Sequence, residues 1–319
     1  MPERALIDRA DEMVNAILER GDATAALRDP ELAPLARVAA NLRHYPRPEF
    51  TARLRTHLER RTTMSAPLVT TNIRQGFTTI TPYLHVKESG LVDFLARAFG
   101  AEETFSARGS AGGVHREVRV GNSMMMIGEG GAEGVMPVRP AAFHVYVEDA
   151  DATFQRAIRA GGTSLGAPDE RPYGERAGFV KDPFGNHWYI ATHRGPSYIP
   201  EGLRSVTPFL HVTGTAEYIE FLKRALGAVE ERRDDKEGSV RYARLRIGNA
   251  VLEFGEADRG VEPMPSAFYL YVDDADALYR RAIDAGARSL WPPADQPYGD
   301  RMGGVEDAAG NQWFIARAA

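Results

Sequence analysis

The pattern of apolar and polar residues predicts a strand, a helix and three further strands in the segment from residue 79 onward. Residues 79–86 alternate, which is typical of a strand with two different faces. Apolar residues then recur at helical spacing over 91–99, and Gly100 is placed to end that helix. Short strands are expected near 102–107, 114–120 and 123–128. The unit therefore has the order βαβββ.

The same order begins again within the next residues. A strand is expected at 143–147, followed by a helix that Asp149 or Asp151 caps. Further strands are expected near 163–166, 177–181 and 187–192. Residues 182–186 read Asp-Pro-Phe-Gly-Asn, which is turn chemistry, and we give this turn no catalytic role.

This pair of units is written twice in the chain. ITPYLHV at 80–86 returns as VTPFLHV at 206–212, and RPYGERAGFVKDPFGNHWYIA at 171–191 returns as QPYGDRMGGVEDAAGNQWFIA at 296–316. The N-terminal segment differs, because its apolar residues form three stripes at helical spacing. We predict a helical segment at 1–61, a linker at 62–77, one domain at 78–193, a linker at 194–202 and a second domain at 203–319.

Composition narrows the class of protein. The chain is 43% hydrophobic and 26% charged, as in ordinary globular proteins, and it has no cysteine, which excludes disulfides and thiolate chemistry. A net charge of −5 argues against general nucleic-acid binding, although arginines in the N-terminal segment leave that alternative open. No apolar run is long enough to cross a membrane, so we predict a cytoplasmic protein.

The strings PYLHV, GNSMMMIGE, YVEDADA and DPFGNHWYIATH resemble the vicinal oxygen chelate superfamily, which includes glyoxalase I, extradiol dioxygenases and bleomycin resistance proteins. Residues 199–212 are similar to its PhnB-like branch. The resemblance implies an α+β fold of tandem domains. In each domain two βαβββ units would face each other, and their curled mixed sheets would enclose a ligand cavity.

The resemblance also implies where a metal would bind, namely on the first and last strands of each unit. These positions carry Thr81, Met126, Ala142 and Tyr189 in the first copy, and Thr207, Glu253, Ala267 and Phe314 in the second. Only Glu253 is a usual metal ligand, and one carboxylate alone holds a transition metal poorly. We therefore expect no metal and no cofactor.

Polar side chains on the predicted cavity faces are the candidates for ligand binding. The set is Tyr83, His85, His144, Tyr146, Arg176, His187, Tyr189, His211, Tyr269 and Arg301. We expect the first copy to bring three histidines into one cavity and to bind its ligand more strongly than the second. Each histidine could instead form only a hydrogen bond at a strand end. Each arginine could pair locally with the acid before it.

The sequence thus favours a protein that binds or sequesters a small molecule without the family metal, with no catalytic residue assigned. One alternative is a metal-dependent lyase, isomerase or dioxygenase that uses a shifted histidine set. Another is a ligand sensor that acts through the N-terminal helices. The expected partners are a small molecule and, within the chain, the other copy, since the two copies are predicted to pack as a pseudo-dimer.

Overall fold

The computed structural model describes residues 28, 33, 36, 68, 70–109, 112–130, 137–258 and 260–319. The predicted N-terminal helices and most of the first linker lie outside these residues. The chain divides into two compact units, Met1–Thr63 and Met64–Ala319, and the second unit holds all the elements named below. No helix among the described residues is long and apolar enough to span a membrane.

Four βαβββ units follow one another, as predicted. The first copy contains β1 (Ile80–Val86), α4 (Leu91–Phe99), β2 (Glu102–Arg108), β3 (Val114–Val120), β4 (Ser123–Glu129), β5 (Ala142–Tyr146), α5 (Ala150–Arg159), β6 (Thr163–Arg171), β7 (Glu175–Lys181) and β8 (His187–His193). The second contains β9 (Val206–Val212), α6 (Thr215–Leu226), β10 (Val229–Lys236), β11 (Ser239–Ile247), β12 (Ala250–Glu256), β13 (Ala267–Tyr271), α7 (Ala275–Asp284), β14 (Arg288–Asp295), β15 (Arg301–Glu306) and β16 (Gln312–Arg317). The predicted α+β class is confirmed.

Local signals in the sequence explain the helix ends. Gly100 adopts the left-handed conformation with φ 69° and ends α4, because its backbone N–H bonds back to the last turn. The cap of α5 is Asp149 rather than Asp151, since the Asp149 side chain accepts a hydrogen bond of 2.9 Å from the Ala152 amide. Asp274 caps α7 in the same way.

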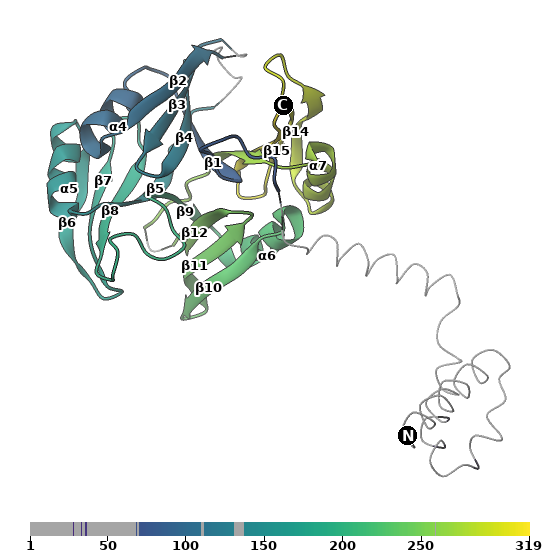
Figure 1. Cartoon of the computed structure of the whole chain (residues 1–319). Helices are drawn as coiled ribbons and strands as arrows, with labels where there is room; N and C mark the ends of the chain where they lie inside the picture. The colour runs from purple at the N-terminus through teal and green to yellow at the C-terminus, as the bar shows by residue number, and fades with distance from the viewer. Residues whose placement is uncertain are drawn as a thin grey trace. The chain divides into compact units, whose positions relative to one another are not determined.

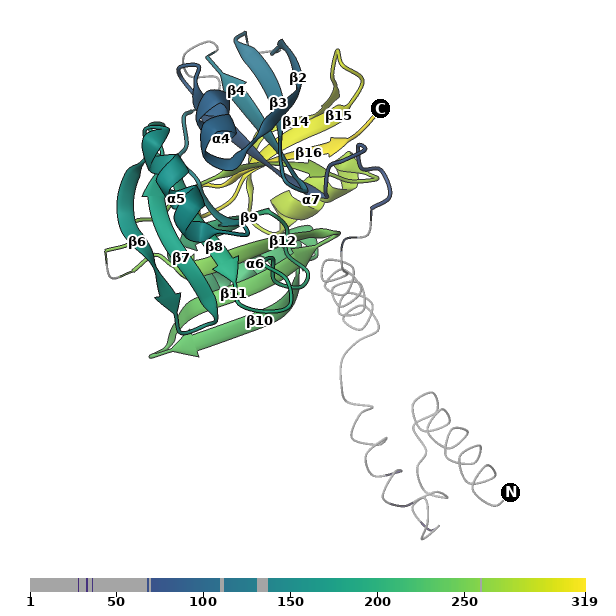
Figure 2. The ribbon, with the colours of Figure 1, turned by 60° about the vertical axis from the view of Figure 1, so that its left-hand side comes forward.

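Each eight-stranded sheet combines one unit from each copy (Figures 1 and 2). The first sheet has the order β14-β15-β16-β13-β1-β4-β3-β2, and the second β10-β11-β12-β9-β5-β8-β7-β6. The copies join where β1 pairs antiparallel with β13 and β5 pairs antiparallel with β9. The prediction that the two units of one copy enclose one cavity is therefore wrong.

The core explains this exchange of partners. Within the first copy, α4 and α5 pack together through Phe94, Leu95 and Phe154, above Phe143 and Trp188 on the strands. The two units of one copy thus meet on their helix side. Their edge strands β1 and β5 are left with unpaired backbone groups, which the second copy satisfies. Each copy supplies most of one apolar core, into which the other copy contributes a single buried residue, Val206 in one and Ile80 in the other, whereas each concave sheet face is shared.

The Asp-Gly-Asn turn is structural, as predicted. The Asp182 carboxylate accepts hydrogen bonds from the Phe184 and Asn186 amides and, at 2.9 Å, from the indole N–H of Trp188. The turn thereby fixes the first residues of β8 against the core.

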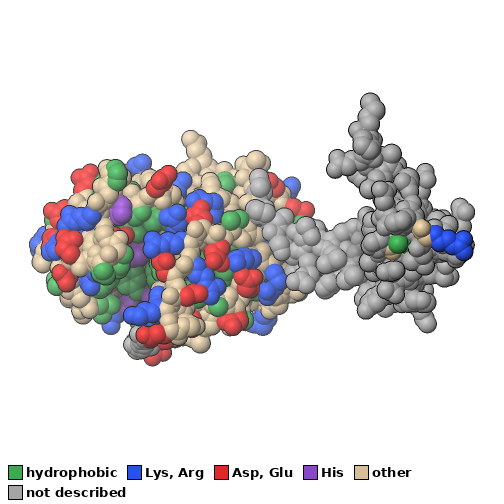
Figure 3. Space-filling view, turned by 90° about the horizontal axis from the view of Figure 1, so that it is seen from below, with side chains coloured by type: hydrophobic (Ala, Val, Ile, Leu, Met, Phe, Trp, Pro, Cys, Tyr) green, Lys and Arg blue, Asp and Glu red, His purple; other side chains and the backbone are tan. Residues whose placement is uncertain are grey.

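The segment just before β1 packs against the first sheet. Asp273 accepts hydrogen bonds from the backbone amides of Thr71 and Asn72, and the Asn72 side chain donates to the carbonyl of Ala318. These contacts bring Arg74 to the concave face of that sheet. The other concave face belongs to the second sheet. Seen from below, hydrophobic side chains gather with histidines in the left half of the compact unit Met64–Ala319 (Figure 3).

Candidate functional site

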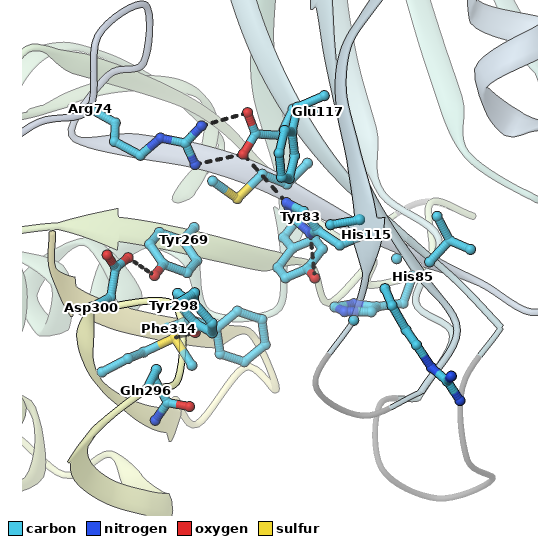
Figure 4. Close-up of a pocket in the computed structure, with 18 of the residues that line it drawn as sticks. Arg74, Tyr83, His85, His115, Glu117, Tyr269, Gln296, Tyr298, Asp300 and Phe314 are labelled. Carbon is cyan, nitrogen blue, oxygen red and sulfur yellow. Dashed lines mark hydrogen bonds and ion pairs between the residues drawn. The ribbon is translucent and has the colours of Figure 1, made fainter. Parts of the chain in front are cut away.

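A cavity of about 910 Å³ lies on the concave face of the first sheet (Figure 4). Its walls come from both copies, because Tyr83 and His85 stand on β1 whereas Tyr269 and Phe314 stand on β13 and β16. The loop before β15 adds Tyr298 at the rim, where its side chain is half exposed. A cavity of this size can hold a drug-sized molecule.

The walls are mainly aromatic. The Tyr83 ring lies 4.3 Å from the His85 ring and edge-on to Phe314 at 5.7 Å, and Trp291 stacks on Phe314 at 5.6 Å. Met126 completes the floor. Flat faces and polarizable sulfur favour a planar, largely apolar ligand.

A chain of polar contacts runs along one wall (Figure 4). Arg74 donates two hydrogen bonds to the buried Glu117 carboxylate, at 2.6 and 2.7 Å. His115 Nε2 lies 3.5 Å from the same carboxylate, and His115 Nδ1 lies 3.0 Å from the Tyr83 hydroxyl. Burial raises the pKa of Glu117, but the hydrogen bonds from His115 and Arg74 outweigh it and hold the pKa below its usual value. Glu117 is therefore charged but neutralised within the wall.

The charged side chains of the lining balance one another, because Glu117 is paired with Arg74 and Glu129 with Arg116, and Arg108 and Asp300 have opposite charges. Tyr269 donates a hydrogen bond of 2.5 Å to Asp300, and burial raises the pKa of Tyr269, so it stays a phenol. Burial, helped by His115 and Arg139, lowers the pKa of His85 to about 4, so its imidazole is neutral. A neutral ligand suits this environment.

The concave face of the second sheet holds a different set of polar pairs. His144 Nδ1 lies 2.6 Å from Glu253 Oε2, and Tyr242 donates to Glu253 Oε1 at 2.6 Å. The Tyr189 hydroxyl oxygen lies 2.6 Å from His211 Nε2. Burial, followed by the charges of His187 and His144, lowers the pKa of His211 to about 4, so the ring is neutral and its Nε2 can accept a hydrogen bond from the Tyr189 hydroxyl.

The predicted site residues divide between these two faces. Tyr83, His85 and Tyr269 line the cavity of the first sheet. The second sheet carries His144 and Tyr146 on β5, His187 and Tyr189 on β8, and His211 on β9. The expected convergence of three histidines in one cavity is wrong, because His85 belongs to a different sheet from His144 and His187.

The two arginines stand apart from both sets. Arg176 forms an ion pair with Asp151, and Arg301 forms one with Asp276, in the first turns of α5 and α7. These pairs tie each arginine to a carboxylate at a helix N-terminus. Arg301 does not line the cavity.

Sequence reasoning missed the residues that give the first cavity its polarity. Arg74 lies in the predicted linker, where no periodicity marks it, and Glu117 is an acid on a strand rich in charged residues. A signal was available in the strand period, since Glu117 and His115 are two residues apart and must share a face.

The family metal positions do not suit a transition metal. The first sheet brings together Thr81, Met126, Ala267 and Phe314, and the second Ala142, Tyr189, Thr207 and Glu253. Among the residues that the structure describes, no three His, Asp or Glu side chains are grouped as a metal ion requires. Glu253 already has His144 and Tyr242 as partners.

The buried His85 predicts an acid-sensitive fold. Its folded-state pKa of about 4 lies below the unfolded value, so the unfolded chain binds the extra proton as the pH falls from about 6.5 toward 4. Stability is full above that window, and about 2 kcal/mol per such histidine is lost by pH ~5. Urea unfolding measured above that window and again at pH ~5 should show that His85→Asn loses less stability on acidification than the wild type. An equal loss in both proteins would contradict the assignment.

Paired βαβββ units around a shared cavity define a vicinal oxygen chelate fold. The sequence model of the Glyoxalase/Bleomycin resistance protein/Dioxygenase superfamily matches residues 90–190 and again 206–315. The chain belongs to this superfamily, as the sequence motifs predicted.

Relatives support the same placement. The Mycobacterium bovis protein Mb0911c is 33% identical over 122 residues, which cover 35% of this chain and 80% of that protein. A Mycobacterium bovis protein with the provisional name glyoxylase CFP32 is 24% identical over 195 residues, or 60% of this chain and 73% of that protein. The crystal structure of glyoxalase I from Zea mays matches with a TM-score of 0.57 and 16% identity, covering 74% of this chain and 92% of that one. This last likeness concerns the fold alone.

Proposed function

We propose that the protein binds a small, neutral, planar molecule in the cavity of the first sheet and does so without a metal ion. The observation that carries this proposal is the cavity itself, whose aromatic walls are combined with a few hydrogen-bonded polar groups of balanced charge. An apolar cavity with a few fixed polar groups is the usual form of a small-molecule site.

The names of the relatives suggest a glyoxalase-type enzyme as an alternative. The family metal positions of the first sheet carry Thr81, Met126, Ala267 and Phe314, which supply no imidazole or carboxylate. Binding therefore explains the residues present better than metal-assisted chemistry does. The binding strength would come from apolar area removed from water.

Trp291 offers a direct test, because it lines the cavity whereas Trp188 and Trp313 are buried in the cores. The neutral dye N-phenyl-1-naphthylamine is expected to bind with one dye per chain and to receive energy from Trp291. Binding should be unchanged after dialysis against EDTA. The transferred signal should fall in Trp291→Phe, because the donor that lines the cavity is then missing, and the dye's own fluorescence still reports binding.

A variant of the wall completes this test. Tyr83→Ala removes a ring that contacts His85 and Phe314, so the affinity for the dye should fall about tenfold. Tyr279→Ala serves as a matched control, because Tyr279 lies on α7, outside the cavity lining. Loss of dye binding with EDTA, recovered on adding Zn²⁺, would reject the metal-free proposal.

A further inference from the structure

Residues 70–77, which we call the strap, are held at one end by a surface outside the first cavity. The side chain of Asp273, an exposed residue just before α7, accepts hydrogen bonds from the Thr71 amide at 2.9 Å and the Asn72 amide at 2.8 Å. None of these three residues lines the cavity. Hydrogen bonds at an exposed surface open locally at low cost, so this end of the strap can be released while the sheet stays folded.

The other end of the strap forms part of the cavity wall. A turn closed by the hydrogen bond from the Phe77 amide to the Arg74 carbonyl, at 3.0 Å, places Arg74 at the wall. Gly76 in this turn has φ 86°, a conformation that favours glycine. The Phe77 side chain is buried in the same apolar cluster as Met126 and Phe314, which line the cavity. The strap therefore links an exposed surface to the cavity.

Arg74 joins the strap to a buried charge (Figure 4). Its guanidinium pairs with the carboxylate of Glu117, whose side chain is 3% exposed, whereas the side chain of Arg74 is 45% exposed. If Arg74 left, the partner remaining among the described side chains would be His115, with Nε2 at 3.5 Å. A buried carboxylate that loses its guanidinium draws water into the cavity, and a neutral ligand then binds less well.

The second copy repeats the strap without this ion pair. The string IRQGF returns shortly before β9 as IPEGL, so the two apolar positions and the glycine are kept. Pro200 stands in the place of Arg74, and Arg244 on β11 stands in the place of Glu117 on β3. Arg244 donates instead to a backbone carbonyl of the second strap, at 3.1 Å. Packing alone thus explains the apolar positions, whereas the buried ion pair belongs to the first cavity.

We propose that the strap and the first cavity are coupled, so that a ligand in the cavity holds the strap in place and the strap, through Arg74, keeps the cavity suited to a neutral ligand. This inference rests on the proposed function, because it concerns the regulation of the same cavity. With the strap docked, Glu117 is neutralised, and with the strap released, it is an unpaired charge. Ligand binding and docking of the strap at Asp273 must then favour each other by the same factor.

Amide hydrogen exchange of the full chain, followed by mass spectrometry, measures the strap directly. The amides of Thr71 and Asn72 should exchange about tenfold more slowly when N-phenyl-1-naphthylamine is present at about ten times its Kd, because the dye suppresses the released state. Neither residue lines the cavity, so direct shielding by the dye does not explain such a slowing.

Asp273→Ala removes the acceptor that holds the strap and leaves the cavity lining intact. Exchange in the strap should accelerate, and the affinity for the dye should fall about threefold, as expected when about a third of the molecules keep the strap docked. The matched control is Glu148→Ala, the same change before α5, which should leave the affinity unchanged. In a Glu117→Gln background no carboxylate needs Arg74, so Asp273→Ala should weaken the dye less than it does in the wild type.

Two results would overturn the coupling and leave the proposed function standing. One is a wild type that binds the dye without slower exchange at Thr71 and Asn72, a measurement that needs no variant to fold. The other is an Asp273→Ala protein whose strap exchanges faster while its affinity for the dye is unchanged. A wild type that does not bind the dye would reject the proposed function, and the coupling with it.

Discussion

A chain cut between its two copies is expected to remain a single particle. A protease site inserted between Pro196 and Ser197 would lie in an exposed stretch, and cleavage there should leave both sheets intact. The halves are joined by β1 with β13 and by β5 with β9, at positions such as Thr81 opposite Tyr269. Separation would expose both edges and open the shared cavity.

Size-exclusion chromatography and thermal melting measure this effect. The cut protein should elute with the uncut insertion variant, which is the control, and melt in one transition. Its halves should separate only in denaturant. If the two halves separate after cleavage as independent, folded monomers, the pairing of β1 with β13 and of β5 with β9 is contradicted.

The order of elements could be predicted from the sequence because it depends on local signals. The two-residue period placed Tyr83 and His85 on one face, and that face is the cavity wall. Gly100 and the Asp182 turn behaved as their residue types require. Such features depend on a few neighbouring residues, so one sequence is enough to find them.

The pairing of the units could not be predicted in the same way. The edge strands ITPYLHV and VTPFLHV are nearly the same in both copies. The local sequence therefore does not determine whether β1 pairs with a strand of its own copy or with one of the other copy. The choice is made by the packing of α4 on α5, which turns the strand edges of one copy away from each other. That is a property of the assembled fold.

The arginines show the same limit on a smaller scale. The sequence offers Glu175 and Asp300 as local partners for Arg176 and Arg301, but the carboxylates they bind are those of Asp151 and Asp276, 25 residues earlier in each case. The repeat preserved a helix-to-strand ion pair that only the tertiary structure reveals. Because both acids stand in the first turn of a helix, these contacts give the repeated arginine a structural role.

Replacing Asp307 with alanine is expected to lower the free energy of unfolding by about 4 kcal/mol. Asp307 is 4% exposed and accepts hydrogen bonds from the Tyr218 hydroxyl at 2.7 Å and the Trp313 indole at 2.8 Å. It also accepts from the amide of Asn311 at 2.9 Å. Alanine would leave these donors buried without an acceptor.

The first copy supplies the matched control. Asp182 holds the corresponding turn, with Asn186 and Trp188 as donors, but no tyrosine hydroxyl of the described residues donates to it. Asp182→Ala should therefore cost about 1 kcal/mol less than Asp307→Ala.

Urea unfolding followed by tryptophan fluorescence measures both changes. Tyr218→Phe should lose about 1 kcal/mol in the wild type but much less in the Asp307→Ala background, since the acceptor is then already gone. Equal losses from Tyr218→Phe in both backgrounds would show that the hydroxyl bond contributes nothing. If Asp307→Ala is as stable as the wild type, the turn does not contribute to holding β16 in place.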